Sequence, residues 1–299
     1  MSAGKRRLKC SLLKNATKRG VPPRAFVTGA ASGLGQRFCQ ELLSKGVSLA
    51  AFDLHFDSSA RNALESMATP GQKVEFYTAD VSDANAVAAA VDQAIDDVEA
   101  PDLVIHSAGI CEPSTFLETS AESFTRSINI NLIGTRNVAA AALPVMAAGS
   151  HIVLVASLAG ISANYSYAGY SASKFGVVGL TEVLRMEMIE RDIDVTSLCP
   201  AEIMTPMVLK EQERVDPIRI KLKAFAGSME LDQACTLIMQ GIAARKPRLV
   251  PGFRAKLTVL LTHVMPGLAR KIARHMIRSE LGRERAAIRG KAHRDVAGL

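Results

Sequence analysis

The chain has 299 residues, of which 48% are hydrophobic, so it can bury one large core, and its net charge at pH 7 is +7. Five scattered cysteines without a C-x-x-C pair argue against a disulfide framework or a zinc site, and predict reduced thiols in a cytoplasmic protein: Cys10, Cys39, Cys111, Cys199 and Cys235. No apolar run reaches the roughly 18 residues that span a bilayer, and residues 1–24 lack the apolar segment of a secretory signal.

Short apolar stretches alternate with helical patterns along the chain. The expected strands are 25–27, 47–52, 74–78, 103–106, 151–155, 195–199 and a last one near 248–250. The expected helices are 36–45, 58–68, 83–98, 121–146, 167–191 and 230–244. This alternation predicts an α/β fold, a Rossmann-type doubly wound parallel sheet of about seven strands with right-handed crossovers. Ligands of such sheets bind beyond the carboxyl ends of the strands, where we find Gly29, Asp53, Asp80, Gly109, Ser157 and Pro200.

The first expected strand runs into a glycine-rich turn, Thr28-Gly-Ala-Ala-Ser-Gly-Leu-Gly35. Its glycines permit a tight turn and a close approach of the backbone to a pyrophosphate, which the free N–H groups of the next helix can bind. The spacing is G-x-x-x-G-x-G, and the alternative is a βα turn without a ligand. Asp53 follows Gly35 by eighteen residues, at the end of the second strand. Its carboxylate can accept hydrogen bonds from ribose hydroxyls and would repel a 2′-phosphate, which predicts NAD rather than NADP; the alternative is a turn-forming aspartate.

A second group of residues indicates proton chemistry. Tyr170 and Lys174 are four residues apart, so in a helix both side chains lie on one face. A lysine ammonium beside a phenol favours the phenolate and moves its pKa from about 10 toward working pH. Ser157 ends an expected strand and can bring its hydroxyl to the same point. Such a site can take a proton from an alcohol or give one to a ketone.

Together these residues resemble the short-chain dehydrogenase/reductase family over roughly residues 24 to 250. The matching motifs are Thr28 to Gly35, Asp80-Val81, His106-Ser-Ala-Gly109, Asn131, Ser157, Tyr170-Ser-Ala-Ser-Lys174, and Pro200 to Thr205. The resemblance implies a nicotinamide cofactor, hydride transfer at a carbinol carbon and a homodimer or homotetramer. It also implies the following cofactor-binding residues: Thr28, Gly29, Ser32, Gly33, Leu34, Gly35, Asp53, Asp80, Val81, Ser107, Ala108, Gly109, Tyr170, Lys174, Pro200, Ile203 and Thr205.

The resemblance also implies a role for each catalytic residue. Tyr170 exchanges the hydroxyl proton, Lys174 lowers its pKa and binds the nicotinamide ribose, and Ser157 holds the substrate oxygen. Asn131 anchors a water that relays protons from Lys174; the alternative is a polar residue that bends its helix. Asp80 meets the adenine edge, or else caps the next helix. Tyr165 and Tyr167 have no lysine four residues on, so we expect them in the substrate pocket or on the surface.

Two positions depart from the family pattern. His106-Ser107 stands where the family usually has two asparagines, from which we expect altered bracing between neighbouring strands. Ala201 follows Pro200 where glycine is usual, and it has less backbone freedom. Neither position is catalytic.

The segment 203–227 is expected to close over the substrate. Its apolar residues, among charged ones, favour a lipophilic alcohol or ketone, such as a steroid, retinoid, aryl or acyl-chain compound. A surface helix pair that packs its apolar face on the body is the alternative. No metal is expected, because the motifs contain no ligand set.

Charge divides the chain into three parts. Residues 1–24 form a basic arm of net charge +8, residues 25–252 the dinucleotide-binding and catalytic domain, and residues 253–299 a basic amphipathic extension. Residues 245–299 carry +11, which leaves −12 on residues 25–244. The extension has apolar residues at helical spacing beside Arg270, Arg274 and Arg278, with Pro266 and Gly267 favouring two short helices. This pattern suits peripheral contact with an anionic membrane, or else packing on the body or a second subunit. Nucleic acid is not expected.

The leading hypothesis is an NAD-dependent alcohol dehydrogenase acting on a lipophilic secondary alcohol. The alternatives are an NADPH-dependent 3-oxoacyl carrier-protein reductase, a non-catalytic nucleotide-binding scaffold at a membrane surface, and a sugar-nucleotide epimerase. Asp53 counts against the first alternative, the intact Ser157, Tyr170 and Lys174 against the second, and the lack of a sizeable extra substrate domain against the third.

Overall fold

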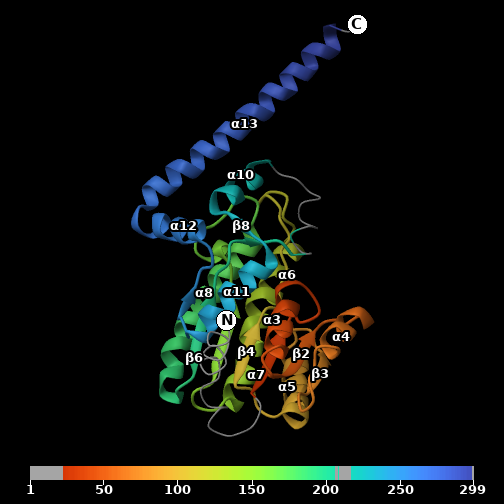
Figure 1. Cartoon of the computed structure of the whole chain (residues 1–299). Helices are drawn as coiled ribbons and strands as arrows, with labels where there is room; N and C mark the ends of the chain where they lie inside the picture. The colour runs from red at the N-terminus through yellow and green to blue at the C-terminus, as the bar shows by residue number, and fades with distance from the viewer. Residues whose placement is uncertain (1–22, 206–207, 209–216, 298–299) are drawn as a thin grey trace, which may run out of the picture.

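The computed structural model describes residues 23–205, 208 and 217–297, with side chains up to residue 283. Its centre is a seven-stranded parallel sheet in the order β3-β2-β1-β4-β5-β6-β9 (Figure 1). The strands are β1 (Arg24–Thr28), β2 (Ser48–Asp53), β3 (Val74–Thr78), β4 (Leu103–His106), β5 (His151–Val155), β6 (Asp194–Leu198) and β9 (Arg248–Leu249). The strand order reverses between β1 and β4, which is where such sheets bind their ligands. The predicted Rossmann-type fold is confirmed.

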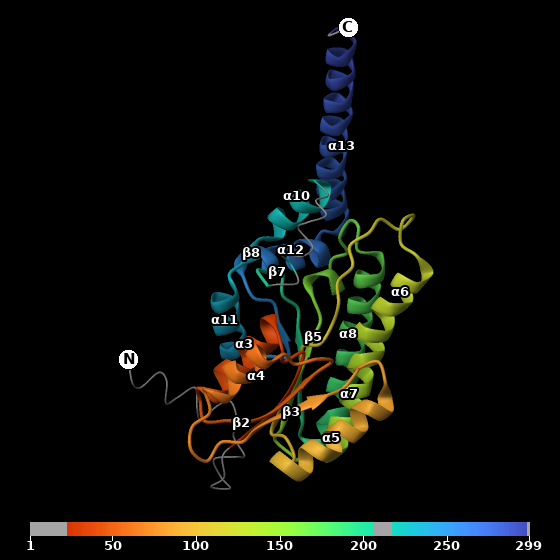
Figure 2. The ribbon, with the colours of Figure 1, turned by 90° about the vertical axis from the view of Figure 1, so that its right-hand side faces the viewer.

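Helices cover both faces of the sheet (Figure 2). One face carries α3 (Gly33–Leu43), α4 (Ser58–Glu65) and α11 (Leu231–Ala243). The other carries α5 (Ala84–Val98), α6 (Ala121–Ile128), α7 (Gly134–Ala142) and α8 (Ala168–Glu187). Each face has its own buried apolar cluster, because strands in a parallel sheet are apolar on both sides.

The expected helix over residues 121–146 is present, but it is not α-helical throughout. A π-helical turn, Asn129–Ile133, separates α6 from α7, and a 3₁₀ turn, Leu143–Val145, follows α7. The break coincides with Asn131, whose buried amide bonds to a neighbouring loop, and π-bulges of this kind are frequent at functional sites. The expected helix over 167–191 is α8 followed by a 3₁₀ turn, Met188–Arg191.

The remaining elements lie beyond the carboxyl ends of the strands. They are the short pair β7 (Glu202–Ile203) and β8 (Ser228–Met229), and the helices α10 (Pro217–Ala226), α12 (Phe253–Val264) and α13 (Pro266–Ala297). The chain does break at Pro266, but α13 is not short: it has 32 residues and projects past α10 (Figures 1 and 2). Proline is favoured at a helix start, and Gly267 falls in the first turn, so neither residue interrupts α13.

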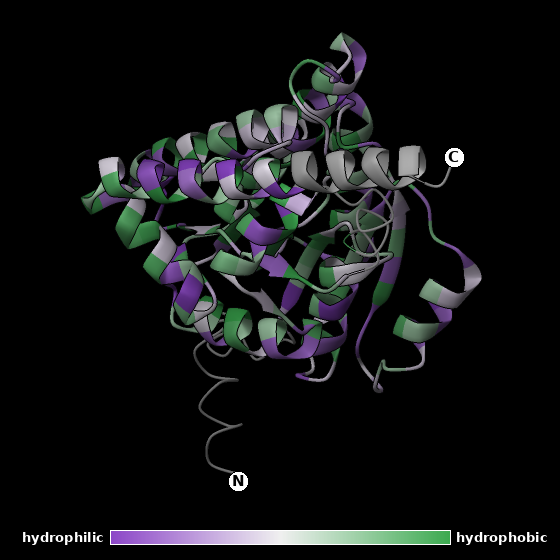
Figure 3. Ribbon diagram, turned by 90° about the horizontal axis from the view of Figure 1, so that it is seen from above, coloured by the Kyte–Doolittle hydropathy of each residue, from purple (hydrophilic) through white to green (hydrophobic). Residues whose placement is uncertain are grey.

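Two contacts tie α13 to α10. The Lys221 ammonium donates to the Ser279 hydroxyl at 2.6 Å and pairs with the Glu280 carboxylate at 2.5 Å. Figure 3 looks down on this end of the molecule and shows α13 passing in front of the body, with hydrophilic turns along it. Among the described residues, no helix is long and apolar enough to cross a bilayer.

Candidate active site

A cavity of about 630 Å³ lies beyond the carboxyl ends of the strands. The glycine-rich turn after β1 lines one end of it, and α10, α12 and α13 line the other. Ser157, Tyr170 and Lys174 lie on its wall between these ends. The volume falls in the range of about 300–1,000 Å³ that is typical of ligand sites.

The glycine-rich turn has the shape of a phosphate cradle. Gly29 and Gly33 have φ of +69° and +54°, in the left-handed region that favours glycine. A Cβ on Gly35 would lie 2.0 Å from the Gly29 carbonyl oxygen, so only glycine lets α3 start this close to β1. Ser32, the N-cap of α3, leaves its helix without a side-chain cap, and both Ser32 and Leu34 line the cavity. Free N–H groups at a helix start bind anions, so the turn fits a pyrophosphate.

Asp53 lies at the end of β2 and lines the same part of the cavity. Its carboxylate accepts hydrogen bonds from the backbone N–H groups of Ala31 at 2.9 Å and Leu54 at 2.7 Å. The side chain is therefore held in place beside the glycine-rich turn. A fixed carboxylate here suits the hydroxyls of an adenosine ribose.

Asp80 and Val81 follow β3 and also line the cavity. Asp80 accepts hydrogen bonds from the backbone and hydroxyl of Ser82 at 2.8 and 2.7 Å. It does not cap the next helix, so that alternative is wrong: Asp83 is the N-cap of α5. The Val81 side chain packs directly against Gly134, because a Cβ on Gly134 would lie only 2.8 Å from it.

His106 takes over the bracing that the family pattern assigns to an asparagine. Its Nδ1 lies 2.7 Å from the Thr28 hydroxyl oxygen, which also accepts the backbone N–H groups of Ser107 and Ala108 at 3.2 and 3.3 Å. The hydroxyl therefore donates to Nδ1, which places the imidazole proton on Nε2. That atom is buried and has no hydrogen-bond partner among the described residues. Burial, with a smaller effect of the Lys174 charge, lowers the pKa of His106 to about 3, so the ring is neutral.

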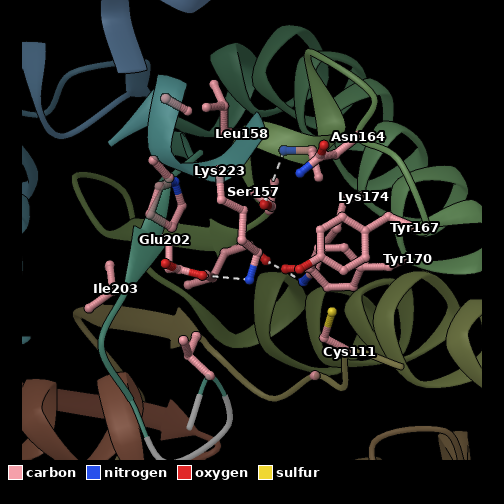
Figure 4. A pocket seen from close by; sticks show the side chains of 18 of the residues that line it. Cys111, Ser157, Leu158, Asn164, Tyr167, Tyr170, Lys174, Glu202, Ile203 and Lys223 are labelled. Carbon is pink, nitrogen blue, oxygen red and sulfur yellow. Dashed lines mark hydrogen bonds and ion pairs between the residues drawn. The ribbon is translucent and has the colours of Figure 1, made fainter. Parts of the chain in front are cut away.

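The structure brings Ser157, Tyr170 and Lys174 together (Figure 4). Ser157 follows β5, and its hydroxyl accepts a hydrogen bond from the Ala159 backbone at 3.1 Å. Tyr170 and Lys174 lie in the first turns of α8, with the ammonium 5.7 Å from the centre of the phenol ring. Burial lowers the pKa of Lys174 to about 8.

Asn131 joins this group from the π-helical turn. Its amide oxygen accepts the Ile110 N–H at 2.8 Å, and its amide nitrogen donates to the Ile110 carbonyl at 2.9 Å and the Ser173 hydroxyl at 3.0 Å. A Cβ on Gly109 would lie 2.9 Å from the Asn131 oxygen and 3.4 Å from Lys174 Nζ. Gly109 therefore lets the loop after β4 lie directly against both side chains.

The segment after β6 completes the cofactor side. Pro200, Ile203 and Thr205 all line the cavity. Ala201 is not among the non-glycine residues with positive φ, so alanine fits here without backbone strain. Met207, Leu209 and the rest of 209–216 lie outside the described residues, as do residues 1–22.

Several cavity residues were not singled out as site residues by the sequence. Cys111 and Asn164 line the cavity, and Glu202 forms an ion pair with Lys223 there (Figure 4). Tyr165 and Tyr167 line the cavity as expected. Glu202 falls within the motif Pro200 to Thr205 and Lys223 within the segment 203–227, but no sequence pattern paired them, because they meet only when β7 and α10 fold over the strand ends. None of the cysteines that the structure describes forms a disulfide.

The C-terminal extension packs on the body and forms the far wall of the cavity. Apolar residues of α12 and α13 line it: Leu261, Ala269, Ile272, Ala273, Met276 and Ile277. Val259 packs on the apolar cluster beneath. Part of the apolar face of the extension thus covers the cavity, while Leu257, Leu260, Val264 and Leu268 remain 41–67% exposed.

Comparisons with known proteins agree with this geometry. A family model described as short chain dehydrogenase matches residues 23–216. A 3-dehydrosphinganine reductase of Arabidopsis thaliana is 35% identical over 227 residues, which cover 74% of this chain and 68% of that protein. A 3-oxoacyl-[acyl-carrier-protein] reductase of Thermotoga maritima is 31% identical over 213 residues, which cover 70% of this chain and 86% of that protein.

Solved structures show the same relationship. A short chain dehydrogenase/reductase of Burkholderia phymatum, in complex with NAD, superposes with a TM-score of 0.72 at 26% identity, over 83% of this chain and 95% of that one. The chain therefore belongs to the short-chain dehydrogenase/reductase family of oxidoreductases. The resemblance inferred from the sequence motifs is confirmed.

Proposed function

We propose that this protein is an NAD-dependent oxidoreductase that interconverts a lipophilic secondary alcohol and its ketone. One observation carries the proposal. The Ser157, Tyr170 and Lys174 side chains open onto a cavity whose far wall is built from apolar residues of α12 and α13. An apolar wall beside a proton-exchanging group suits a substrate that has a hydrocarbon portion next to its carbinol carbon.

The chain's own residues would divide the work as follows. Ser157 donates a hydrogen bond to the substrate oxygen, and Tyr170 exchanges the hydroxyl proton with it. Lys174 holds a positive charge near the phenol and so favours the phenolate. The nicotinamide, when bound, gives or accepts the hydride.

Asn131 would act behind Lys174. Its amide braces the loop after β4 through Ile110 and the helix α8 through Ser173. In that position it can hold a water between Lys174 and solvent, as the family resemblance implies. This role would let the proton taken up by Tyr170 leave the buried site.

The choice of NAD rests on Asp53. Two backbone N–H groups fix its carboxylate beside the cradle, and a 2′-phosphate would bring like charges together there. The solved relative from Burkholderia phymatum, which holds NAD, supports this choice.

The test is an assay that follows the absorbance of NADH. It measures the reduction of ketones with NADH and the oxidation of secondary alcohols with NAD, over a series of chain lengths. The proposal predicts that kcat/KM rises with chain length. Ala273 lines the far wall, and Ala273→Phe should lower kcat/KM for long ketones at least tenfold more than for short ones. Ala244→Phe, at an exposed position after α11, is the matched control. A flat chain-length profile would contradict the lipophilic assignment.

A second candidate is reduction of a 3-oxoacyl group on a carrier protein. The similarity to the reductase of Thermotoga maritima favours it, and the basic extension could contact an acidic carrier. NADPH-dependent turnover of a 3-oxoacyl carrier-protein substrate, exceeding that of free ketones with NADH, would establish this candidate instead.

We also propose that α12 and the start of α13 contact an anionic membrane. Phe253, Leu260, Val264 and Met265 are 51–80% exposed, and they lie in an extension with a large excess of arginine and lysine. Each basic residue near such a surface contributes about 1 kcal/mol. This placement would bring the mouth of the cavity to the phase in which lipophilic substrates concentrate.

A homodimer or homotetramer completes the proposal. Phe175, Val183, Met186 and Ile189 on α8 and the turn after it are 44–74% exposed, which is typical of a surface covered by a second subunit. The mass in solution, measured by light scattering, tests this assembly.

A further inference from the structure

An ion pair stands inside the substrate end of the cavity, where the other walls are largely apolar. The Lys223 ammonium, from α10, lies 2.5 Å from the Glu202 carboxylate, from β7. The two side chains are only 16% and 13% exposed. Both line the cavity, and Figure 4 shows them facing Tyr167 and Tyr170 across it.

The pair ties α10 to β7, but an ion pair is a costly way to join two elements. Removing two charges from water costs several kcal/mol each, and well-packed apolar residues of similar size are often as stabilising. Lys221, two residues before Lys223, already ties α10 to α13. A pair that holds both charges at the substrate position is better explained by recognition of a polar substrate group.

The Tyr167 ring connects the pair to Tyr170. Lys223 Nζ is 5.6 Å from the centre of the Tyr167 ring, and that ring is 5.4 Å from the Tyr170 ring. The aromatic ring gives the lysine a second partner through cation–π attraction. If a substrate cation took over the Glu202 carboxylate, the Lys223 charge would therefore keep a favourable neighbour.

We propose that Glu202 selects substrates that carry an ammonium group on the carbon next to the reacting carbonyl, and that Lys223 holds the carboxylate until such a substrate binds. The substrate class is thus a long-chain α-amino ketone or the matching amino alcohol. The hydrocarbon chain lies along α12 and α13, and the amine meets Glu202. The inference rests on the proposed function, because it names the substrate of the same site.

The test compares two long-chain ketones of equal length: one with an amine on the carbon next to the carbonyl, and one without the amine. For the unaltered protein with NADH, kcat/KM should favour the amine by roughly 10- to 100-fold, as expected for a hydrogen bond to a charged group. The N-acetyl derivative, which is neutral, should lose this preference.

Two variants have opposite expected effects. Glu202→Gln should bring the preference close to one, because the amide no longer attracts the ammonium. Lys223→Met should raise the preference, because the substrate amine then meets a carboxylate without a competing partner. A merely structural ion pair would make both variants change the preference in the same way. Glu187→Gln, at an exposed position on α8, is the control.

The outcomes distinguish a failure of the proposed function from a failure of the role assigned to Glu202. If neither ketone is reduced by the unaltered protein, the proposed function fails. If both ketones are reduced with equal kcat/KM, the function stands and the role of Glu202 is refuted. A preference that survives Glu202→Gln, or that falls in Lys223→Met, also overturns the inference. If Glu202→Gln does not fold, the N-acetyl derivative and Lys223→Met still decide.

Discussion

Lys174 donates a hydrogen bond from its ammonium to the Val155 carbonyl oxygen at 2.9 Å, and this contact links α8 to the end of β5. Ser157 follows Val155 by two residues, so the same contact holds Tyr170 and Lys174 on α8 close to the serine after β5. The lysine is 4% exposed, and its burial is the main reason that its pKa falls from 10.5 to about 8.

The lowered pKa of Lys174 predicts how stability changes with pH. Between pH 8 and 10.5 the folded protein has lost this proton while the unfolded chain still binds it, so the free energy of unfolding rises with pH. Lys174→Met lacks this dependence. From pH 7 to 10.5, wild type should gain roughly 3 kcal/mol of stability relative to Lys174→Met.

Urea unfolding at several pH values measures this difference. Lys246→Met, at an exposed position before β9, is the control and should show no such trend. A constant difference between wild type and Lys174→Met across this range would mean that Lys174 keeps its proton in the fold.

Asp53 predicts the cofactor preference. Asp53→Ser removes the negative charge beside the adenosine ribose and keeps a short hydrogen-bonding side chain. The ratio of kcat/KM for NADH to that for NADPH should fall at least tenfold, which corresponds to about 1.4 kcal/mol. Asp57→Ser, at the N-cap of α4, is a matched control on the same segment. Tighter binding of NADPH than of NADH by the unaltered protein would show that the Asp53 assignment is wrong.

Two buried histidines predict sensitivity to acid. Burial lowers the pKa of both His106 and His151 to about 3, from an ordinary value of 6.5. As the pH falls below 6.5, the unfolded chain takes up protons that the fold does not, so stability is lost. Each histidine should lower the free energy of unfolding by roughly 2 kcal/mol as the pH falls from 6.5 to 5.

His106→Asn restores the amide of the family pattern and should make this loss about half as steep. Thermal unfolding between pH 5 and 7 measures the slope, with His55→Asn as the control at an exposed position. An unchanged slope in His106→Asn would place the acid sensitivity elsewhere.

The exposed apolar residues of α12 and the start of α13 predict membrane binding: Leu257, Leu260, Val264 and Leu268. The protein should co-sediment with phosphatidylglycerol-rich vesicles at low salt, and Leu260→Ser with Val264→Ser should weaken this binding at least tenfold, because apolar area no longer enters the interface. Leu237→Ser is the control, since this apolar residue on α11 is 41% exposed and lies outside the basic extension. Wild-type protein that stays in the supernatant would contradict this prediction. A smaller mass in solution for Leu260→Ser with Val264→Ser would show instead that a second subunit covers this part of α12.

The sequence predicted the sheet, and it predicted which residues lie together at the carboxyl ends of the strands, because local patterns encode both. Apolar runs gave the strands, and the spacing of Tyr170 and Lys174 marked one face of α8. The π-helical turn at Asn131 was not predicted, since the periodicity on either side is continuous and the cause is a hydrogen bond to Ile110, twenty-one residues away.

Local patterns did not predict the contacts at the end of the cavity that α10, α12 and α13 line. The apolar spacing in α12 and α13 fits membrane, partner or body equally, and only the folded chain shows Ile272 and Met276 against the cavity. Glu202 and Lys223 are twenty-one residues apart and no sequence pattern pairs them, so the ion pair depends on how α10 folds back over β7. Contacts that join distant segments are set by tertiary packing, which periodicity does not record.

The most direct test of the central claim is the activity and cofactor binding of Tyr170→Phe. The change removes only the phenolic hydroxyl, so NADH binding, measured by calorimetry, should match wild type. Turnover of a long-chain ketone should fall at least a thousandfold, in the range that a positioned acid–base group contributes together with its orienting contacts. Substantial turnover by Tyr170→Phe with NADH bound would contradict the account and move the proton-exchanging role to Tyr165 or Tyr167.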